Sequence, residues 1–498
     1  MIVIGKWVTA VFALLFIAGC CAPSNNDEVQ FTILQLNDVY EMTPLGQVDG
    51  KGGQGGLARV ATIKKELKEK NSNTWAVLAG DMVSPSAIGL AKIDGKRAAG
   101  AQMVAGVNPF LDLMAIGNHE FDIKQNELIE RIAESKFQWI TSNLTQTGGA
   151  PISGVEDHHI FEAKTGSHSL KVGVFSVCID IDEDWIEFEP DHVKVAKQQI
   201  KALKDKGAEY IIALTHLSIT EDTNLAQMVP DIDVIMGGHE HENIDVRRGS
   251  DFTPILKADA NARTVYIHRI TWNPETKEST IKSELRLVDD SIADDPETKA
   301  IVDEWQSKAF ASFREEGIEP TNPVAKPNED LDGKEASVRN GSTRLTQIIA
   351  EGMKDIAQAQ VSIYNGGSIR IDDELPANQM LTEYDVLRIL PFGGQVVLVN
   401  IKGSLLKKIL DQGVQNKGSG GFLQYAGISG GTGAWALNDT PIQDNTEYQV
   451  AFTDFLLTGR ETGLDYLTRD NPDLTVVGEK GDVRLALSTR LKQEYPNQ

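Results

Sequence analysis

The chain has 498 residues, and its 41% hydrophobic and 24% charged residues are typical of a folded protein rather than a disordered one. Its length exceeds what one hydrophobic core supports, so two domains are expected. The formal net charge of −24 argues against nucleic acid as the main partner, because a phosphate backbone requires a basic surface. Small anionic substrates stay compatible, since metal ions or a few Arg side chains can reverse the sign locally.

The N-terminal segment is predicted to be a lipoprotein signal peptide. Lys6 precedes an apolar stretch over residues 7–17, which is too short to cross a bilayer as a helix. Residues 17–20 read Ile-Ala-Gly-Cys and resemble the bacterial lipobox, so cleavage is expected after residues 1–19, with the lipid on Cys20. The alternative is a plain signal peptide cut near Ala22. If Cys20 carries the lipid, residues 20–29 would tether an extracytoplasmic protein, periplasmic or at the cell surface, to a bacterial membrane by that lipid alone.

Apolar runs recur through the first half of the chain, and each run ends at a residue that can bind a metal ion. In chain order these residues are Asp38, Asp81, Asn118 with His119, His216, and His239 with His241. Between the first two runs, residues 57–70 carry apolar side chains at helical spacing. Strands alternating with helices predict a sheet covered on both sides, with ligands gathered at one end of the strands. One such Asp or His is usually structural, but five strand ends of this kind predict a metal centre.

The chemistry of these side chains indicates divalent ions and phosphoester hydrolysis. Carboxylate, amide and imidazole groups without a thiolate suit Mn, Zn, Fe or similar ions. The carboxylate of Asp81 could bridge two ions about 3.5–4 Å apart, an arrangement that activates water for in-line attack on phosphorus. In the stretch GNHEFD, Asp122 could hold His119 protonated, ready to assist a leaving oxygen. Taken alone, that stretch would favour a hydrogen-bonded loop histidine.

The second half begins with a connector and continues into a second alternating set of elements. Residues 291–333 are predicted to form an acidic, helix-rich connector that ends in a linker rich in Pro and Asp. Residues 361–367, 395–403 and 447–454 are predicted strands, and Ser404 is expected to begin a helix. The pair Gly366-Gly367 suits a tight turn that presents Arg370 to an anion, although an ordinary turn with a surface Arg is the alternative.

These motifs carry a resemblance to a known family. The stretches NDVY, GDMV, GNHEFD, THLS and GGHEH, in that order, resemble the five sequence blocks of calcineurin-like metallophosphatases. YNGGSIR and LPFGG resemble the C-terminal domain of the 5'-nucleotidase and UDP-sugar hydrolase family. The resemblance covers residues 30 to 470. It implies a four-layer α/β/β/α metallophosphoesterase domain over residues 30–290 and a smaller α+β substrate-binding domain over residues 334–498.

The resemblance also implies roles for the strand-end residues. The first metal ion would be held by Asp38, Asp81 and His241, and the second by Asp81, Asn118, His216 and His239. His119 and Asp122 would form the catalytic dyad. The family has His at the position of Tyr40, so the first site has lost a ligand and is expected to hold its ion weakly. Two roles for Tyr40 stay open: it ligates the metal, or it packs there or hydrogen-bonds a metal-bound water.

The same resemblance implies a substrate pocket in the second domain, with departures from the family pattern. Arg339 and Arg370 would contact the phosphate, and Phe392 and Phe455 would stack on the base. Residues 459–463 read GRETG where the family grips ribose with a Gly-Gly-Asp-Gly-Tyr stretch. Glu461 could still accept the ribose hydroxyls, whereas Arg460 adds a cation. Two further departures are Ser342 in place of a Glu and Gly394 in place of an Asn.

The sequence therefore predicts a metallophosphoesterase that releases phosphate from 5'-nucleotides through attack by a metal-bound hydroxide, with two divalent ions as cofactors. The expected partner is a nucleotide or another small phosphoester. The first alternative keeps the fold but acts on a nucleotide sugar, a cyclic nucleotide or a non-nucleotide phosphoester, which the altered ribose stretch favours. The second is an inactive surface binding protein, and the retained His119, Asp122 and second metal site argue against it.

Overall fold

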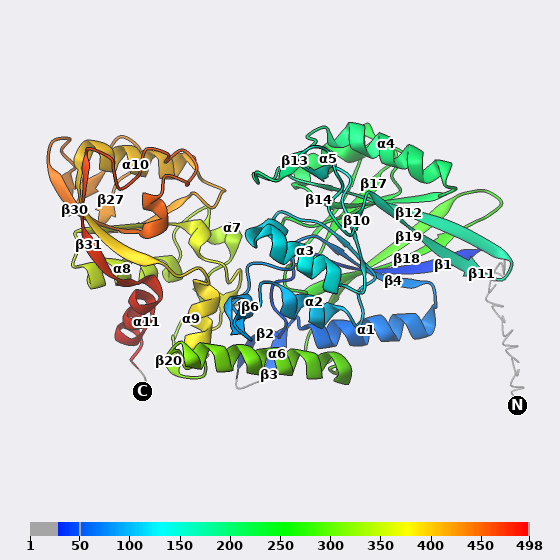
Figure 1. Ribbon diagram of the computed structural model, residues 1–498, viewed down its shortest axis with the longest axis horizontal. Helices are drawn as coiled ribbons and strands as arrows, with labels where there is room; N and C mark the ends of the chain where they lie inside the picture. The colour runs from blue at the N-terminus through cyan, green and yellow to red at the C-terminus, as the bar shows by residue number, and fades with distance from the viewer. Residues whose placement is uncertain (1–27, 49–50, 497–498) are drawn as a thin grey trace, which may run out of the picture.

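The computed structural model describes residues 28–48 and 51–496, which form two domains (Figure 1). The predicted signal peptide and Cys20 lie outside the described residues. Among the described helices, none is long and apolar enough to cross a membrane.

The first domain is built on two sheets. The seven-stranded sheet consists, in spatial order, of β10 (Val155–Glu156), β8 (Gln138–Ile140), β7 (Leu113–Ala115), β4 (Thr74–Ala79), β1 (Val29–Leu36), β18 (Thr264–Trp272) and β19 (Ser279–Leu287). The six-stranded sheet consists of β11 (His158–Thr165), β12 (His168–Cys178), β14 (Tyr210–His216), β15 (Val234–Gly237), β17 (Thr253–Lys257) and β16 (Ile244–Arg248). The central strands of each sheet are parallel, so their carboxyl ends lie at one edge of that sheet.

The two sheets face each other, and helices cover their outer faces. Along β1, Phe31 and Ile33 enter the core between the sheets, whereas Leu34 and Leu36 enter the core beneath the helices. The first sheet is covered by α1 (Leu57–Lys70), α2 (Ala101–Val107), α3 (Gln125–Glu134) and α6 (Pro296–Glu315), and the second by α4 (His192–Asp205) and α5 (Ile219–Met228). This arrangement confirms the predicted four-layer α/β/β/α domain.

The second domain contains one mixed sheet with helices on both faces, which confirms the predicted α+β domain. Its strands, in spatial order, are β26 (Leu423–Ala426), β22 (Val361–Asn365), β30 (Glu447–Thr453), β25 (Gln395–Lys402) and β31 (Leu474–Asp482). One face packs against α8 (Arg344–Ala357), α9 (Glu383–Ile389) and α11 (Val483–Glu494), and the other against α10 (Gly403–Gln415). The short helix α7 (Glu335–Val338) precedes α8.

Short paired strands and 3₁₀ turns lie outside these main sheets and helices. The paired short strands are β2 (Leu45–Val48) with β3 (Lys51–Gln54), β5 (Lys92–Ile93) with β6 (Lys96–Arg97), β9 (Leu144–Gln146) with β13 (Ile186–Phe188), and β28 (Ala436–Leu437) between β27 (Ile428–Ser429) and β29 (Thr440–Pro441). The 3₁₀ turns are η1 (Ile88–Leu90), η2 (His119–Asp122), η3 (Gly366–Ser368) and η4 (Asp454–Leu457). Two of these turns carry predicted site residues, His119 with Asp122 in η2 and Phe455 in η4.

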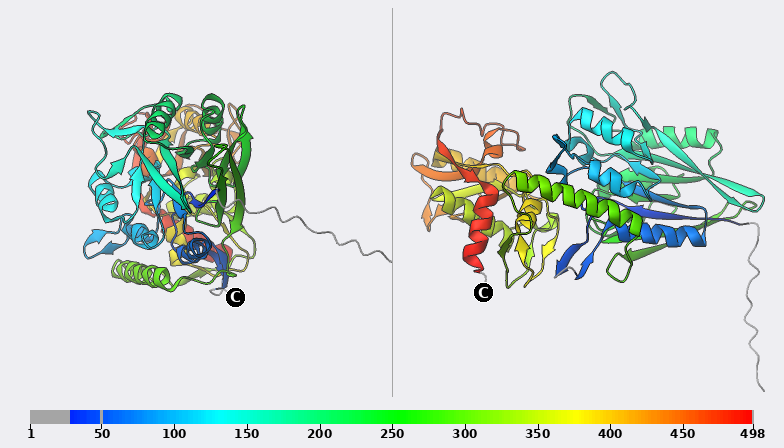
Figure 2. Two further views of the ribbon diagram at one scale, coloured as in Figure 1. Left: turned by 90° about the vertical axis from the view of Figure 1, so that its right-hand side faces the viewer. Right: turned by 60° about the horizontal axis from the view of Figure 1, so that its bottom comes forward.

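The connector between the domains divides into two parts. Helix α6 packs on the first domain through Val302, Ala309 and Phe313, and Figure 2 shows it extending toward the second. The segment from 323 to 332 contributes β20 (Pro323–Ala325) and β21 (Leu331–Asp332), which pair with β24 (Leu381–Thr382) and β23 (Glu374–Leu375) of the second domain. The part predicted to be a linker is therefore paired with strands of the second domain.

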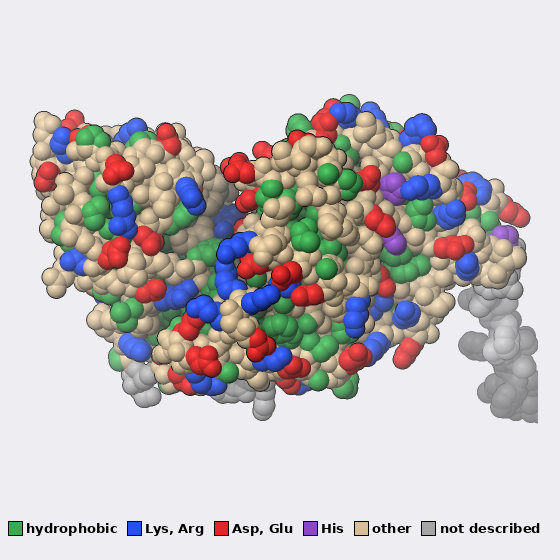
Figure 3. All heavy atoms as spheres, in the orientation of Figure 1, with side chains coloured by type: hydrophobic (Ala, Val, Ile, Leu, Met, Phe, Trp, Pro, Cys, Tyr) green, Lys and Arg blue, Asp and Glu red, His purple; other side chains and the backbone are tan. Residues whose placement is uncertain are grey.

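The two domains meet at a boundary rich in charged groups. Figure 3 shows Lys and Arg side chains along the surface between the domains. Within the boundary, Arg388 Nε of α9 donates to Glu41 Oε1 of the first domain over 3.1 Å, and both residues are buried. Because a buried charge is stable only when it is paired, this contact explains why the polar segment after β1 ends in a carboxylate.

Candidate active site

The predicted ligands come together at the ends of strands from both sheets. Asp38 follows β1, Asp81 follows β4, Asn118 follows β7, His216 ends β14 and His239 follows β15. One ligand atom each from Asp38, Asp81 and His216 lies within 4.8 Å of the others, and all three residues are buried. The sandwich thus joins, at one edge, groups that are up to 201 residues apart in the chain.

Several of these residues occupy a strained backbone conformation. The φ angles of Asp38, Asp81 and His239 are 52°, 61° and 79°, in the left-handed region that residues with a side chain rarely adopt. Each such residue costs on the order of 1–3 kcal/mol and persists only where its surroundings hold it. One restraint is the amide of His239, which donates to Asp38 Oδ2 over 3.0 Å. The left-handed conformation thus occurs at three of the predicted ligand positions.

Two glycines allow the ligand loops to approach each other. A Cβ on Gly117 would lie 2.2 Å from Asp81 Oδ1, and a Cβ on Gly238 would lie 2.2 Å from the carbonyl oxygen of Ala79. Both distances are far inside van der Waals contact, so any side chain at these positions would push the loops apart.

Glu120, which was not among the predicted site residues, connects the loop after β4 to the loop after β7 by hydrogen bonds. Its fully buried carboxylate accepts the backbone N–H groups of Asp81, Met82 and Gly117 over 2.9, 2.7 and 2.7 Å. Burial, followed by the charge of Asp81, raises the pKa of Glu120 to about 7. The residue lies inside GNHEFD, next to His119, so its place in that motif was the available signal.

The side chains predicted to hold the second ion form a donor set that fits a divalent metal. His216 Nε2 lies 3.2 Å from Asp81 Oδ2 and 3.1 Å from Asn118 Oδ1. The other ring nitrogen of His216 donates to the carbonyl of Ala79 over 2.8 Å, so Nε2 is the nitrogen left for a metal. The His239 ring lies edge-on to His216, with 5.4 Å between centroids. Buried carboxylate, amide and imidazole groups suit Mn, Zn or Fe.

The electrostatic environment of Asp38, Asp81 and His216 also favours a bound cation. Burial raises the pKa of Asp38, and the nearby Asp81 adds to that effect. Burial lowers the pKa of His216, but Asp81 and Asp38 outweigh burial and raise it to about 9. Two buried carboxylates that hold positive charge on a neighbouring imidazole are the electrostatic environment in which a bound metal ion is stabilised.

Tyr40 lies among the three side chains predicted to hold the first ion. Its hydroxyl is 3.1 Å from Asp81 Oδ2, 3.2 Å from His241 Nε2 and 3.5 Å from Asp38 Oδ1. Burial, together with the charges of Asp81 and Asp38, raises the pKa of Tyr40 well above its usual value of 10. The hydroxyl therefore keeps its proton in this environment and can donate it to Asp81.

The two residues of the predicted dyad, His119 and Asp122, are in hydrogen-bond contact in the structure. His119 Nδ1 lies 2.8 Å from Asp122 Oδ2, and Asp122 Oδ2 also accepts the hydroxyl of Ser84 over 3.1 Å. Burial lowers the pKa of His119, but Asp81 and Asp122 outweigh burial and raise it above its usual value. His119 Nε2 lies 4.0 Å from Asp81 Oδ2, so this nitrogen is directed toward the metal ligands. The pairing with Asp122 thus leaves Nε2 as the ring nitrogen that can carry a proton toward the cavity.

A cavity of about 980 Å³ joins the predicted residues of both domains. The first domain lines it with Asp81, Asn118, His119, Asp122, His239 and His241, and the second with Arg339, Arg370, Phe392, Phe455, Arg460 and Glu461. Asp38, Tyr40 and His216 are buried and do not line this cavity, although Tyr40 lines a smaller one with His119 and Arg370. The structure thus places every predicted substrate-binding residue on a cavity that four of the predicted metal ligands also line.

The two phenylalanines are exposed inside this cavity. Phe392 and Phe455 are 54% and 42% exposed, whereas most large apolar side chains of the second domain are buried. The guanidinium of Arg370 lies 5.3 Å from the centroid of the Phe392 ring. Exposed rings that line a cavity offer flat apolar surface to a ligand, which a packing role would not require.

The two arginines retain free donors. Arg339 forms an ion pair with Glu335, but its Nε–H, like that of Arg370, has no hydrogen-bond partner among the described residues. Burial, followed by the charge of Arg370, lowers the pKa of Arg339. Two half-buried guanidinium groups that line one cavity and have unused donors are an environment that favours a phosphate.

An acidic pair that was not among the predicted site residues also lines this cavity. Asp182 and Glu183 of the first domain line the cavity in which Phe392, Phe455 and Arg460 lie. Burial, followed by Asp184 and Asp182, raises the pKa of Glu183. These residues follow β12 in an acidic stretch that has the composition of an ordinary surface loop, so only the fold shows that they face the site.

Comparisons with known proteins agree with this geometry. Residues 31–243 match the family model described as calcineurin-like phosphoesterase, and residues 323–468 match the model described as 5'-nucleotidase, C-terminal domain. The chain is 26% identical to the snake venom 5'-nucleotidase of Naja atra over 80% of this chain and 81% of that protein. It is 27% identical to the 5'-nucleotidase of Homo sapiens over 80% and 75%, respectively. Among solved structures, the 5'-nucleotidase precursor of Thermus thermophilus shares the fold with a TM-score of 0.76 and 21% identity, over 94% of this chain and 97% of that one.

Proposed function

The chain belongs to the 5'-nucleotidase family and is a metallophosphoesterase, and from this premise we propose that it releases phosphate from 5'-nucleoside monophosphates. The observation that carries the proposal is the single cavity that is lined by the dyad, by four of the predicted metal ligands, by Arg339 and Arg370 and by two exposed Phe rings. A phosphate at the metal end and a flat base at the Phe end would together occupy the features that the cavity offers.

Each side chain has a role in the proposed reaction. Two divalent ions held by the ligand set would supply Lewis acidity, which neutralises the phosphoryl oxygens and makes water nucleophilic at neutral pH. Arg339 and Arg370 orient the phosphate and balance its charge. His119, oriented by Asp122, holds a proton at Nε2 and gives it to the leaving 5'-oxygen. Asp122 thereby fixes which ring nitrogen faces the substrate.

Truncation of either Phe ring tests recognition of the base. Phe392→Ala and Phe455→Ala should each weaken binding of AMP by about 1–3 kcal/mol, because each removes one stacking face. KM and kcat/KM for AMP are compared with those for p-nitrophenyl phosphate, which lacks a nucleobase and should be much less affected. Leu390→Ala is a matched control, because this buried side chain lies two residues before Phe392 and belongs to the core of the second domain. Equal losses on both substrates would mean that the rings only support the fold.

A substrate panel separates the proposal from its rival. The departures at Ser342, Gly394 and Arg460 favour a nucleotide sugar, a cyclic nucleotide or a non-nucleotide phosphoester on the same fold. Phosphate release by Mn²⁺-loaded protein is measured with 5'-, 3'- and cyclic nucleotides, UDP-glucose and p-nitrophenyl phosphate. The proposal requires the highest kcat/KM on a 5'-monophosphate. A higher value on any other member would assign the cavity to that substrate.

For localisation, we propose that the protein is anchored outside the cytoplasm by a lipid on Cys20. The support is the lipobox-like sequence at residues 17–20. Cys20→Ser should release the protein from the membrane fraction or leave its signal unprocessed, as measured by fractionation and by the mass of the mature protein. Cys21→Ser is the matched control and should leave anchoring intact. A Cys20→Ser protein that is processed and retained normally would exclude lipidation at this residue.

A further inference from the structure

Two histidines of the metal centre are held in different ways. His216 has its Nδ1 bonded to the carbonyl of Ala79, which belongs to the same domain. His241 has its Nδ1 bonded to Asp372 Oδ2 over 2.9 Å, and Asp372 belongs to the second domain, 131 residues further along the chain. The partner of a ligand histidine fixes the ring orientation and the nitrogen that faces the metal. For His241 that partner is supplied from outside its own domain.

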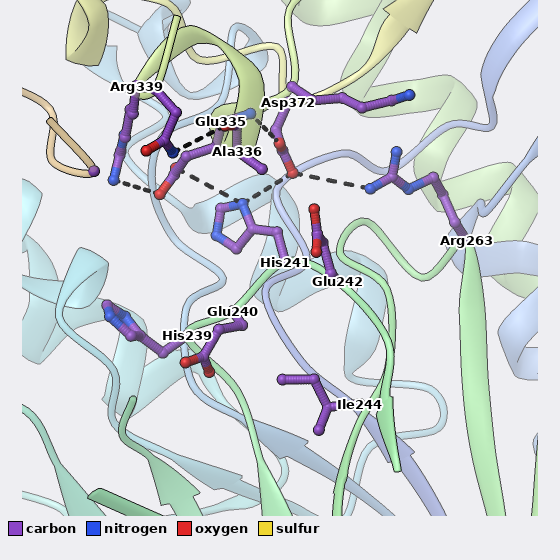
Figure 4. Close-up of a pocket in the computed structure, with 13 residues that line it drawn as sticks. His239, Glu240, His241, Glu242, Ile244, Arg263, Glu335, Ala336, Arg339 and Asp372 are labelled. Atoms are coloured by element: carbon purple, nitrogen blue, oxygen red, sulfur yellow. Dashed lines mark hydrogen bonds and ion pairs between the residues drawn. The ribbon is translucent and has the colours of Figure 1, made fainter. Parts of the chain in front are cut away.

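The surroundings of Asp372 hold its carboxylate in place. The other oxygen of Asp372 accepts the backbone N–H of Glu335 over 2.8 Å, and Arg263 Nη2 of the first domain lies 3.9 Å from Oδ2 (Figure 4). The side chains of Asp372 and His241 are 9% and 11% exposed. A carboxylate tied down by its own domain and directed at the ring of the other domain is suited to orient that ring.

The contact between Asp372 and His241 is linked through Glu335 to Arg339, which is proposed to bind the phosphate. Glu335 forms an ion pair with Arg339, and its carboxylate lies 3.8 Å from His241 Nδ1. His241, Asp372, Glu335 and Arg339 all line a second cavity, of about 310 Å³, at the domain boundary. The pairing therefore lies between the domains rather than within the core of either one.

We propose that Asp372 is a positioning residue that orients His241 for the first metal ion, so that this ion is held by both domains. The inference rests on the proposed function in one respect, because it takes a divalent ion at the first site as given. It predicts that the second ion, whose ligand His216 finds its partner within the first domain, is independent of Asp372.

Binding of Mn²⁺ alone tests this proposal. Equilibrium dialysis of the full chain followed by elemental analysis gives the two dissociation constants, and His241→Ala identifies which one belongs to the first site. Asp372→Ala should weaken first-site binding about 10–100-fold and leave the second constant unchanged. Asp372→Asn keeps an oxygen that can accept from Nδ1, so it should recover part of the loss. The visible spectrum of Co²⁺-loaded protein should change in Asp372→Ala for the first-site ion only.

Asp373→Ala is the matched control. Asp373 lies next to Asp372 and faces Arg263 at 3.8 Å without contacting His241, so its loss should leave both Mn²⁺ constants unchanged. Wild-type first-site binding in both Asp372 variants would overturn the proposal, as would an equal loss in Asp373→Ala, which would indicate general damage to the boundary. Wild-type protein that binds no Mn²⁺ at all would instead overturn the proposed function. Circular dichroism checks that each variant is folded. If Asp372→Ala does not fold, the Mn²⁺ constants of Asp372→Asn are compared with those of the wild type instead.

Discussion

Replacement of His119 by Ala is expected to lower kcat by about 10²–10⁴-fold, the contribution typical of a positioned general acid. The ring is oriented by Asp122 at 2.8 Å, and the surrounding carboxylates raise its pKa, so in the proposed mechanism this ring gives its proton to the leaving oxygen. Ala removes that proton without removing a predicted metal ligand. Metal content should therefore stay at the wild-type level, and this is measured together with kcat on AMP.

The choice of substrate sharpens the His119 experiment. A leaving group that needs no proton, such as p-nitrophenolate, should show a smaller fall in kcat than AMP, whose alkoxide requires protonation. His158→Ala is a matched control, because His158 bonds to Gln199 on the surface of the first domain and does not line the cavity. Loss of metal from His119→Ala would make His119 a ligand and remove it from the role of general acid.

Wild-type protein should bind the second ion tightly and the first substoichiometrically, with activity rising on addition of Mn²⁺. The reason is Tyr40: burial and the neighbouring carboxylates raise the pKa of its phenol, and its hydroxyl lies 3.1–3.5 Å from the three side chains predicted to hold the first ion. A neutral phenol is a poor ligand for Mn²⁺ or Zn²⁺. Tyr40→His restores an imidazole and should tighten first-site binding about tenfold or more, equivalent to about 1.4 kcal/mol.

Tyr40→Phe separates the hydroxyl from the ring. If the phenol is not a ligand, Phe should leave the first-site constant near that of the wild type, whereas His tightens it. Two tightly bound ions in the wild type, with a visible phenolate-to-iron charge-transfer band that Tyr40→Phe abolishes, would make Tyr40 a ligand. The same Mn²⁺ isotherms provide the baseline for the Asp372 variants.

Much of the fold and of the site could be predicted from local sequence. The β1 strand is apolar on both faces because helices cover one side and a second sheet the other, so its uninterrupted apolar run indicated burial. Asp38, Asp81, Asn118, His216 and His239 each follow or end such a run. Parallel strands carry their carboxyl ends to a common edge, and this geometry let five separate strand ends predict one centre.

The departures of this chain from its family were also visible in the sequence. Tyr40 stands where a His is expected, and residues 459–463 depart from the ribose-binding pattern. A motif reports which side chain is present, but not its neighbours. That the hydroxyl of Tyr40 lies among Asp38, Asp81 and His241, rather than in the core, required the packing of both sheets.

The sequence by itself predicted the two-domain organisation, the gathering of possible metal ligands at one edge of the sheets and the pairing of His119 with Asp122, because these depend on periodicity, on motifs and on residues close together in the chain. The tertiary structure alone decided which groups meet across the domain boundary. Glu41 pairs with Arg388 across 347 residues and His241 with Asp372 across 131, and neither pair has a local signal. A buried charge specifies that a partner must exist, but its identity depends on how the two domains pack.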